Sequence, residues 1–148
     1  MTLSRYVYTP DPQEGTLLTP INNSTAVRFF IDNLPINRQG MDPLTRGLEI
    51  GMAHGYWLLG PFLLLGPLRS APGEIALLAA LMSTVGLVTI ATIGLSLFAS
   101  LAKDVPEFSR EGWSRLAGGF LIGGVGGAIF AAALLFIYPV LVQIITIK

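Results

Sequence analysis

Two long stretches without a single charged residue constrain this sequence more than any other feature. Residues 75–102 and 116–147 hold 28 and 32 consecutive residues without Asp, Glu, Lys or Arg. A helix of about 20 apolar residues crosses a bilayer core, so each stretch is long enough to span it. A third apolar stretch, residues 47–68, holds Glu49 and His54. We therefore expect an all-α membrane protein with three transmembrane helices, near 44–64, 75–100 and 116–140.

Helix-boundary residues lie at the ends of these stretches. Asp42-Pro43 is typical of a helix start, because Asp caps free N–H groups and Pro fits the first helical position. The first helix should break or end at Gly60-Pro61 or Gly66-Pro67, and Pro139 should kink or end the third. Strands are a poor alternative, since barrel strands alternate with a period of two and these stretches do not.

The first 42 residues differ in composition, with four prolines among several Asn, Asp and Thr residues. We assign residues 1–42 to an N-terminal segment on the cytoplasmic side, mostly extended on a partner, and residues 43–148 to the three-helix transmembrane domain. Residues 24–33 predict a short amphipathic helix with Ser24 as its N-cap. That helix packs either on a partner or on the protein's own surface.

Composition excludes several classes of function. Nine basic and nine acidic residues give a net charge of zero, so the sequence offers no strong basic patch for a nucleic acid. It contains no cysteine, which excludes disulfides, thiolate zinc sites and iron–sulfur clusters. Its single histidine excludes a His-rich metal site.

The basic residues predict the orientation in the membrane. Two of the nine, Arg69 and Lys148, lie on one side of the predicted spans, and the other seven lie before the first helix or between the second and third. Cytoplasmic loops carry the excess of Lys and Arg. We therefore expect a cytoplasmic N-terminus and a C-terminus across the membrane.

Glu49 and His54 are the candidate functional residues, because polar groups within a span are costly. Their spacing of five rotates them by about 140° and separates them by about 7.5 Å along the helix, so they do not bind one metal together. Each either hydrogen-bonds to neighbouring protein or ligates the metal of its own tetrapyrrole, which needs only one N or O donor from the protein. A further alternative is an ion- or proton-translocating subunit that uses Glu49.

Glycines recur every four residues on two of the predicted helices. The two series are Gly47, Gly51 and Gly55, and Gly119, Gly123 and Gly127. Small residues at this spacing let a helix approach another surface closely. That surface is either a neighbouring helix or a flat macrocycle.

The residues that surround these features resemble a known family. The block NLPINRQGMDPLTRGLEIGMAHGY (residues 33–56) is similar to subunit XI of photosystem I, the PsaL family, of cyanobacterial type. So are LTPI at residues 18–21, LGPLR at 65–69 and EGWS at 111–114. The likeness covers most of the chain and weakens in the second helix and after about residue 134.

The resemblance implies a peripheral, non-enzymatic subunit of photosystem I with three membrane helices. It implies binding of antenna chlorophyll a and β-carotene, with Glu49 and His54 as the axial ligands of chlorophyll magnesium, and trimerisation of the complex. The implied partners are the large core subunits, neighbouring small subunits, lipids and copies of the chain at the trimer axis. The implied location is the thylakoid membrane, or the plasma membrane of a host without thylakoids, with a lumenal C-terminus. A pigment-free assembly subunit is the remaining alternative.

One position departs from the family pattern. Cyanobacterial members commonly continue LGPLR with Asp, which helps to bind a calcium ion near the trimer axis, whereas this chain has Ser70. A neutral hydroxyl is a weak substitute for a carboxylate on a hard cation. The backbone carbonyl of Pro67 remains as a donor, but the exchange argues against a calcium site.

Overall fold

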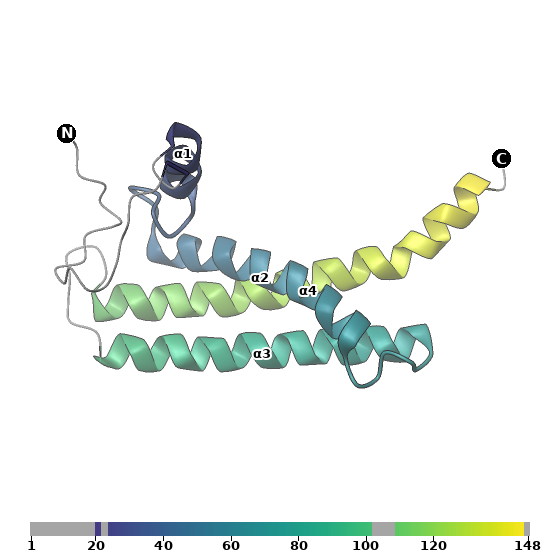
Figure 1. Cartoon of the computed structure of the whole chain (residues 1–148). Coiled ribbons are helices and arrows are strands. Elements are labelled where there is room, and N and C mark those ends of the chain that lie inside the picture. Colours follow the sequence, from purple (N-terminus) through teal and green to yellow (C-terminus); the bar gives the residue numbers. More distant parts are fainter. Residues whose placement is uncertain (1–19, 22–23, 102–108, 147–148) are drawn as a thin grey trace. The chain divides into compact units, whose positions relative to one another are not determined.

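The computed structural model describes residues 20–21, 24–101 and 109–146, with side chains of the last helix up to Pro139. Within these ranges the chain forms helices and no strands, in the order α1 (Thr25–Asn33), α2 (Pro43–Leu65), α3 (Gly73–Leu101) and α4 (Arg110–Thr146) (Figure 1). By length and composition, α2, α3 and the Arg110–Pro139 part of α4 could cross a membrane. The predicted all-α architecture with three candidate spans is confirmed.

The chain divides into two units, Met1–Arg38 and Gln39–Lys148, which are described separately. In the first unit, Ser24 caps α1, since its Oγ accepts a hydrogen bond of 3.3 Å from the Val27 N–H. The helix ends at Asn33 because Leu34 precedes a proline, which disfavours the helical conformation; Leu34 is extended, with ψ of 142°. Phe29 and Phe30 are 71% and 65% exposed, so the described part of this unit leaves an apolar surface of α1 uncovered.

In the second unit, α2 begins and ends beside prolines. Asp42 is its N-cap and accepts from the Leu44 N–H at 3.0 Å, with Pro43 as the first helical residue. Of the two Gly-Pro pairs, Gly66-Pro67 ends the helix, because Gly66 adopts the extended conformation that a following proline favours. Pro61 lies inside α2, where it removes one N–H from the helical hydrogen bonds.

Both α3 and α4 have local signals at their starts. The Pro72 carbonyl accepts from the N–H groups of Ile75 and Ala76, at 2.9 and 3.0 Å. α4 begins at Arg110, earlier than the span expected from hydropathy, because Ser109 caps it: Ser109 Oγ accepts from the Gly112 N–H at 3.1 Å. The charged first turn, which hydropathy does not include in the span, therefore belongs to the same helix.

Pro139 does not end α4, which continues to Thr146. The last turns of the helix, yellow in Figure 1, run at an angle to its first part. A proline inside a membrane helix costs one hydrogen bond, and the helix accommodates it by bending. The sequence predicted that Pro139 would either kink or end this helix, and the structure excludes an end at Pro139.

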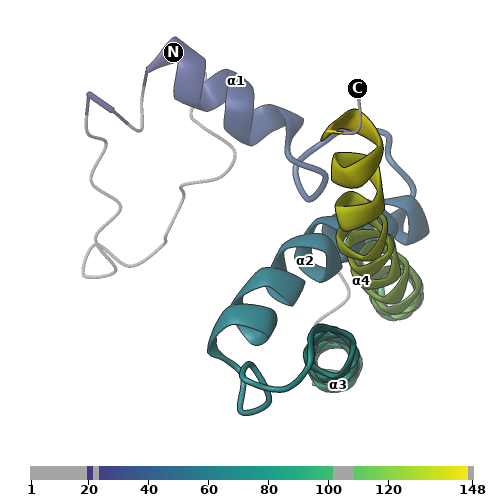
Figure 2. The same ribbon diagram turned by 90° about the vertical axis from the view of Figure 1, so that its right-hand side faces the viewer.

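The three long helices pack through small residues. α2 and α4 run parallel, α3 runs antiparallel to both, and the α2–α4 contact is the most extensive. In Figure 2, α3 and α4 are seen nearly end-on, whereas α2 crosses obliquely. One buried cluster joins all three helices through Leu59, Ala80, Ala131 and Ala132. Lipid tails are as apolar as leucine, so helices in a bilayer associate by close contact rather than by excluding water.

Candidate functional site

The glycine series of α2 contacts the backbone of α4 directly. A Cβ added at Gly47 would lie 2.8 Å from the Phe120 nitrogen, and one at Gly51 the same distance from the Gly124 nitrogen. One at Gly55 would lie 2.9 Å from the Ala128 nitrogen. Real Cβ atoms essentially never come so close to backbone atoms. Only glycine therefore allows this approach at these positions.

The glycine series of α4 makes the reciprocal contact. Added Cβ atoms at Gly119, Gly123 and Gly127 would clash with the backbone of α2 at Leu44, Leu48 and Met52, respectively. Each helix thus places its glycines against the other's backbone with the same four-residue repeat. The sequence allowed either a neighbouring helix or a macrocycle as the surface against these glycines. The structure shows a neighbouring helix, and both series lie in the same α2–α4 contact.

His54 lies on α2 beside this contact and is exposed. Its Nδ1 lies 2.7 Å from the carbonyl oxygen of Ile50, one turn earlier. A carbonyl only accepts, so Nδ1 carries the hydrogen and donates it, and Nε2 of the neutral imidazole keeps its lone pair. A metal-binding histidine is typically held in this way, by a hydrogen bond from the nitrogen that does not bind the metal.

An aromatic side chain from α4 packs against the His54 ring. The ring of Phe120 lies edge-on to the imidazole, with 5.7 Å between the ring centroids and an interplanar angle of 60°. Phe120 is 7% exposed, so it forms part of the packed interior while His54 stays accessible. No sequence pattern singled out Phe120, because its role depends on a contact between two helices far apart in the chain.

Glu49 is half-buried on α2, in the second turn of the helix. A carboxylate in a membrane helix is costly, which is why Glu49 is a candidate functional residue. Within the described parts of the chain, no three His, Cys, Asp or Glu side chains gather to hold a metal ion. If Glu49 or His54 binds a metal, the remaining ligands therefore come from outside the described residues.

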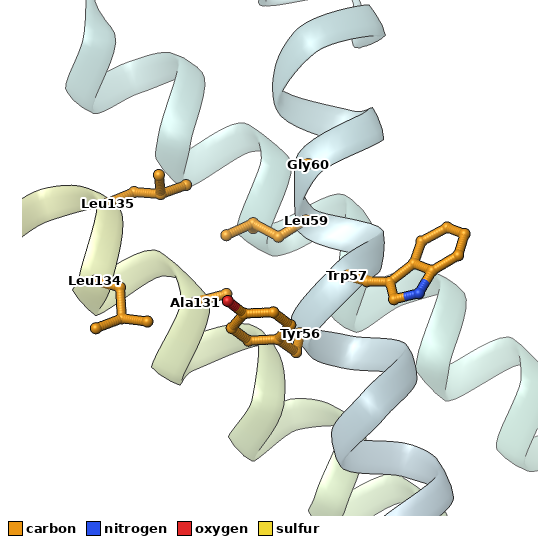
Figure 3. Close-up of a pocket in the computed structure, with 7 residues that line it drawn as sticks. All are labelled: Tyr56, Trp57, Leu59, Gly60, Ala131, Leu134 and Leu135. Atoms are coloured by element: carbon orange, nitrogen blue, oxygen red, sulfur yellow. The ribbon is translucent and has the colours of Figure 1, made fainter.

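A shallow apolar groove lies farther along the same two helices. It has a volume of about 270 Å³ and is lined by Tyr56, Trp57, Leu59, Gly60, Ala131, Leu134 and Leu135. Figure 3 shows the Tyr56 ring reaching from α2 toward α4, while the Trp57 ring points away from α4. Tyr56 also packs against Phe130, with 6.2 Å between the ring centroids. The groove could hold a hydrocarbon chain.

The turn between α2 and α3 contains the two residues considered for calcium. Pro67 and Ser70 are both exposed. The guanidinium of Arg69 donates to the Gly66 carbonyl at 3.4 Å. No carboxylate stands at position 70 of this turn, so the argument against calcium remains the one from Ser70.

An ion pair joins the first turns of α2 and α4. Arg115 Nη2 lies 2.9 Å from Asp42 Oδ1, and both side chains are partly exposed. Asp42 thereby caps α2 with one carboxylate oxygen and pairs with α4 through the other. An exposed pair contributes at most about 1 kcal/mol, so it adds little to the stability of the α2–α4 contact.

Comparisons with known proteins agree on one family. The family profile described as photosystem I reaction centre subunit XI (PsaL) matches residues 6–140. The chain is 75% identical over 140 residues to the protein of that name from Gloeobacter violaceus, a match that covers 94% of each chain. It is 50% identical to the namesakes from Cyanidioschyzon merolae, over 88% of this chain and 94% of the relative, and from Trichormus variabilis, over 82% and 76%.

Proposed function

The chain belongs to the photosystem I reaction centre subunit XI family, and from this membership we propose that it binds chlorophyll through His54 and Glu49, binds carotenoid and joins copies of the complex into a trimer. The family consists of structural reaction-centre subunits, not enzymes. Membership implies other photosystem I subunits as partners, and the three apolar helices make the chain a membrane-embedded subunit.

The geometry of His54 is the observation that carries the chlorophyll proposal. Chlorophyll magnesium takes four nitrogens from its own ring, so the protein needs to supply one N or O donor. His54 offers such a metal ligand. Its Nδ1–H forms a hydrogen bond to the Ile50 carbonyl, so the lone pair of Nε2 remains available to a metal on an exposed side chain. Bound chlorophyll a absorbs light and passes on the excitation energy. The role of His54 and its neighbours is to hold the ring at a fixed distance and angle.

Glu49 supplies a second, independent donor. Five residues separate it from His54, a rotation of about 140° on an α-helix, so the two side chains point in different directions. Two separate rings suit this divergence better than one shared ion. Carboxylate oxygens are also donors that a magnesium ion accepts.

The carotenoid part of the proposal is supported by the groove between α2 and α4. β-Carotene is a pure hydrocarbon and needs no ligand, only an elongated apolar surface. The groove offers part of such a surface with Leu59, Leu134 and Leu135.

The trimer part is supported by the far end of α4. Five consecutive residues, 134–138, are exposed, with Phe136 and Tyr138 at 62% and 64%. A helix that is apolar all round is covered by other protein or by lipid. We propose that copies of this chain cover the exposed end of α4 in the trimer. Complexes from cells that lack the chain should then run as monomers on a native gel, and re-expression should restore the trimer.

The test of the chlorophyll proposal is a His54→Leu variant in the intact photosystem I complex, with Met52→Leu as its matched control. Met52 is also exposed on α2 but has no comparable donor. We expect His54→Leu to lose one chlorophyll per complex and to give an absorption difference band, whereas Met52→Leu keeps both unchanged. An unchanged pigment count and spectrum in His54→Leu, with the chain present, would instead favour the pigment-free assembly subunit.

A further inference from the structure

We propose that Phe120 of α4 is a positioning residue for the His54 site. The inference rests on the function proposed above, because it concerns how the histidine is held for a pigment. Phe120 makes no bond to the metal itself; it acts through the imidazole. Three features of the structure support this role: the ring contact, the hydrogen bond of His54 and the backbone of α4.

The ring contact restricts His54 from one side. The Phe120 ring lies edge-on to the imidazole at 5.7 Å between centroids. Aromatic pairs favour such an arrangement, because the positive edge of one ring meets the negative face of the other. Phe120 is buried and so fixed by its surroundings, while His54 is exposed. The imidazole is therefore packed on the Phe120 side and accessible elsewhere.

The hydrogen bond to Ile50 does not fix the ring by itself. The last torsion of a histidine side chain has a broad energy minimum, so one contact leaves the ring plane free to rock. The bond holds Nδ1 at 2.7 Å from the Ile50 carbonyl. The Phe120 contact adds a second point of restraint, from another helix. Together the two set the direction of the Nε2 lone pair.

The glycine contact in turn fixes where the Phe120 ring lies. The Phe120 nitrogen is the atom that would lie 2.8 Å from a Cβ at Gly47, and the Phe120 carbonyl faces Gly51. The backbone of Phe120 is therefore in close contact with α2 on both sides of its side chain. This close approach places the ring beside His54, so the glycine repeat supports the site as well as the packing.

This arrangement predicts an effect on pigment orientation rather than on pigment number. The lone pair direction sets the tilt of a ligated macrocycle, and the tilt affects its coupling to neighbouring pigments. The test compares Phe120→Leu with Phe130→Leu in the intact complex. Phe130 lies on the same helix but packs against Tyr56. We expect Phe120→Leu to keep the chlorophyll count while the band that His54→Leu removes shifts or broadens in absorption and circular dichroism; Phe130→Leu should leave that band unchanged.

A double variant separates positioning from a general packing defect. In a His54→Leu background, Phe120→Leu should cause no further spectral change. An unaltered band in Phe120→Leu with the chain present, or an equal change in both backgrounds, would overturn the inference. If the leucine variant does not assemble, Phe120→Met, whose long and flexible side chain can fill irregular gaps in a core, replaces it in both backgrounds. Failure of His54→Leu to change pigment count or spectrum would instead refute the proposed function.

Discussion

At the scale of single residues, the bond from His54 to the Ile50 carbonyl assigns the imidazole tautomer. Because Nδ1 carries the hydrogen, the Nε2 lone pair is available to bind a metal, and the His54 side chain is exposed. The sequence marked His54 because it is the one histidine and lies in an apolar stretch. It did not mark Phe120, since an aromatic residue in a membrane helix is ordinary until a neighbouring helix brings it beside a functional group.

Glu49 gives a prediction that compares two replacements at one residue. Glu49→Gln keeps an oxygen donor and removes the charge, whereas Glu49→Leu removes both. We expect Glu49→Leu to lose one chlorophyll per complex and Glu49→Gln to retain it with a shifted absorption band. Pigment extraction and counting of the purified complex measure this. Glu74→Leu, at an exposed position in the first turn of α3, should change neither quantity. Retention of the full pigment count in Glu49→Leu would contradict the assignment.

At the scale of elements, the contact between α2 and α4 depends on two glycine series with the same repeat. The sequence predicted close packing by both series, and the added geometric fact is that they meet each other. Glycines outside the contact behave differently: a Cβ at Gly118 or Gly126 would meet nothing within 4 Å. The four-residue spacing, rather than the number of glycines, identifies the packed face.

This difference predicts opposite outcomes for two alanine substitutions on α4. Gly123→Ala places a methyl group against the Leu48 backbone, whereas Gly126→Ala places one in open space. Overpacking costs about 1–3 kcal/mol, so we expect Gly123→Ala to reduce the amount of the chain in the purified complex and to lower its release temperature. Gly126→Ala should match the unmodified chain. Equal retention of both variants, measured by immunoblot after stepwise heating, would show that the contact tolerates a side chain.

At the scale of the whole molecule, the proposed orientation places the two ends of α3 on opposite sides of the membrane. The excess of Lys and Arg favours a cytoplasmic N-terminus. Because the sequence has no cysteine, one introduced thiol is the only reactive one in the chain. Ser70, after α2, and Ser114, in the first turns of α4, are both exposed and on opposite sides in this orientation.

A labelling experiment follows from this property. In vesicles with the cytoplasmic face outward, a membrane-impermeant maleimide should label Ser114→Cys and spare Ser70→Cys. The reverse pattern is expected in vesicles of opposite orientation. Denaturing detergent should make both thiols reactive, which shows that protection came from the membrane or a partner and not from the residue itself. Labelling of Ser70→Cys alone from the cytoplasmic face would invert the proposed topology.

The helices follow from the amino-acid sequence alone, because the signals that specify them are local. The long uncharged stretches form the membrane-length helices. Asp42-Pro43 and Ser24 mark helix starts within a few residues of their own positions. Other local features left alternatives. Gly60-Pro61 and Gly66-Pro67 are similar signals, and the structure shows that α2 continues through the first and ends at the second. The start of α4 was missed because charged residues 110–115 lower hydropathy without breaking a helix.

The contacts of the site residues, in contrast, depend on how the helices pack together. The spacing of Glu49 and His54 shows that they diverge, and the glycine repeats show that a close approach exists. Which surfaces meet depends on the alignment of two helices separated by α3 in the chain. That alignment places Gly47 and Gly51 against the backbone of Phe120 and the Phe120 ring against His54. The energy of such a contact is the sum of many small van der Waals interactions between helices. No local pattern in the sequence specifies these interactions.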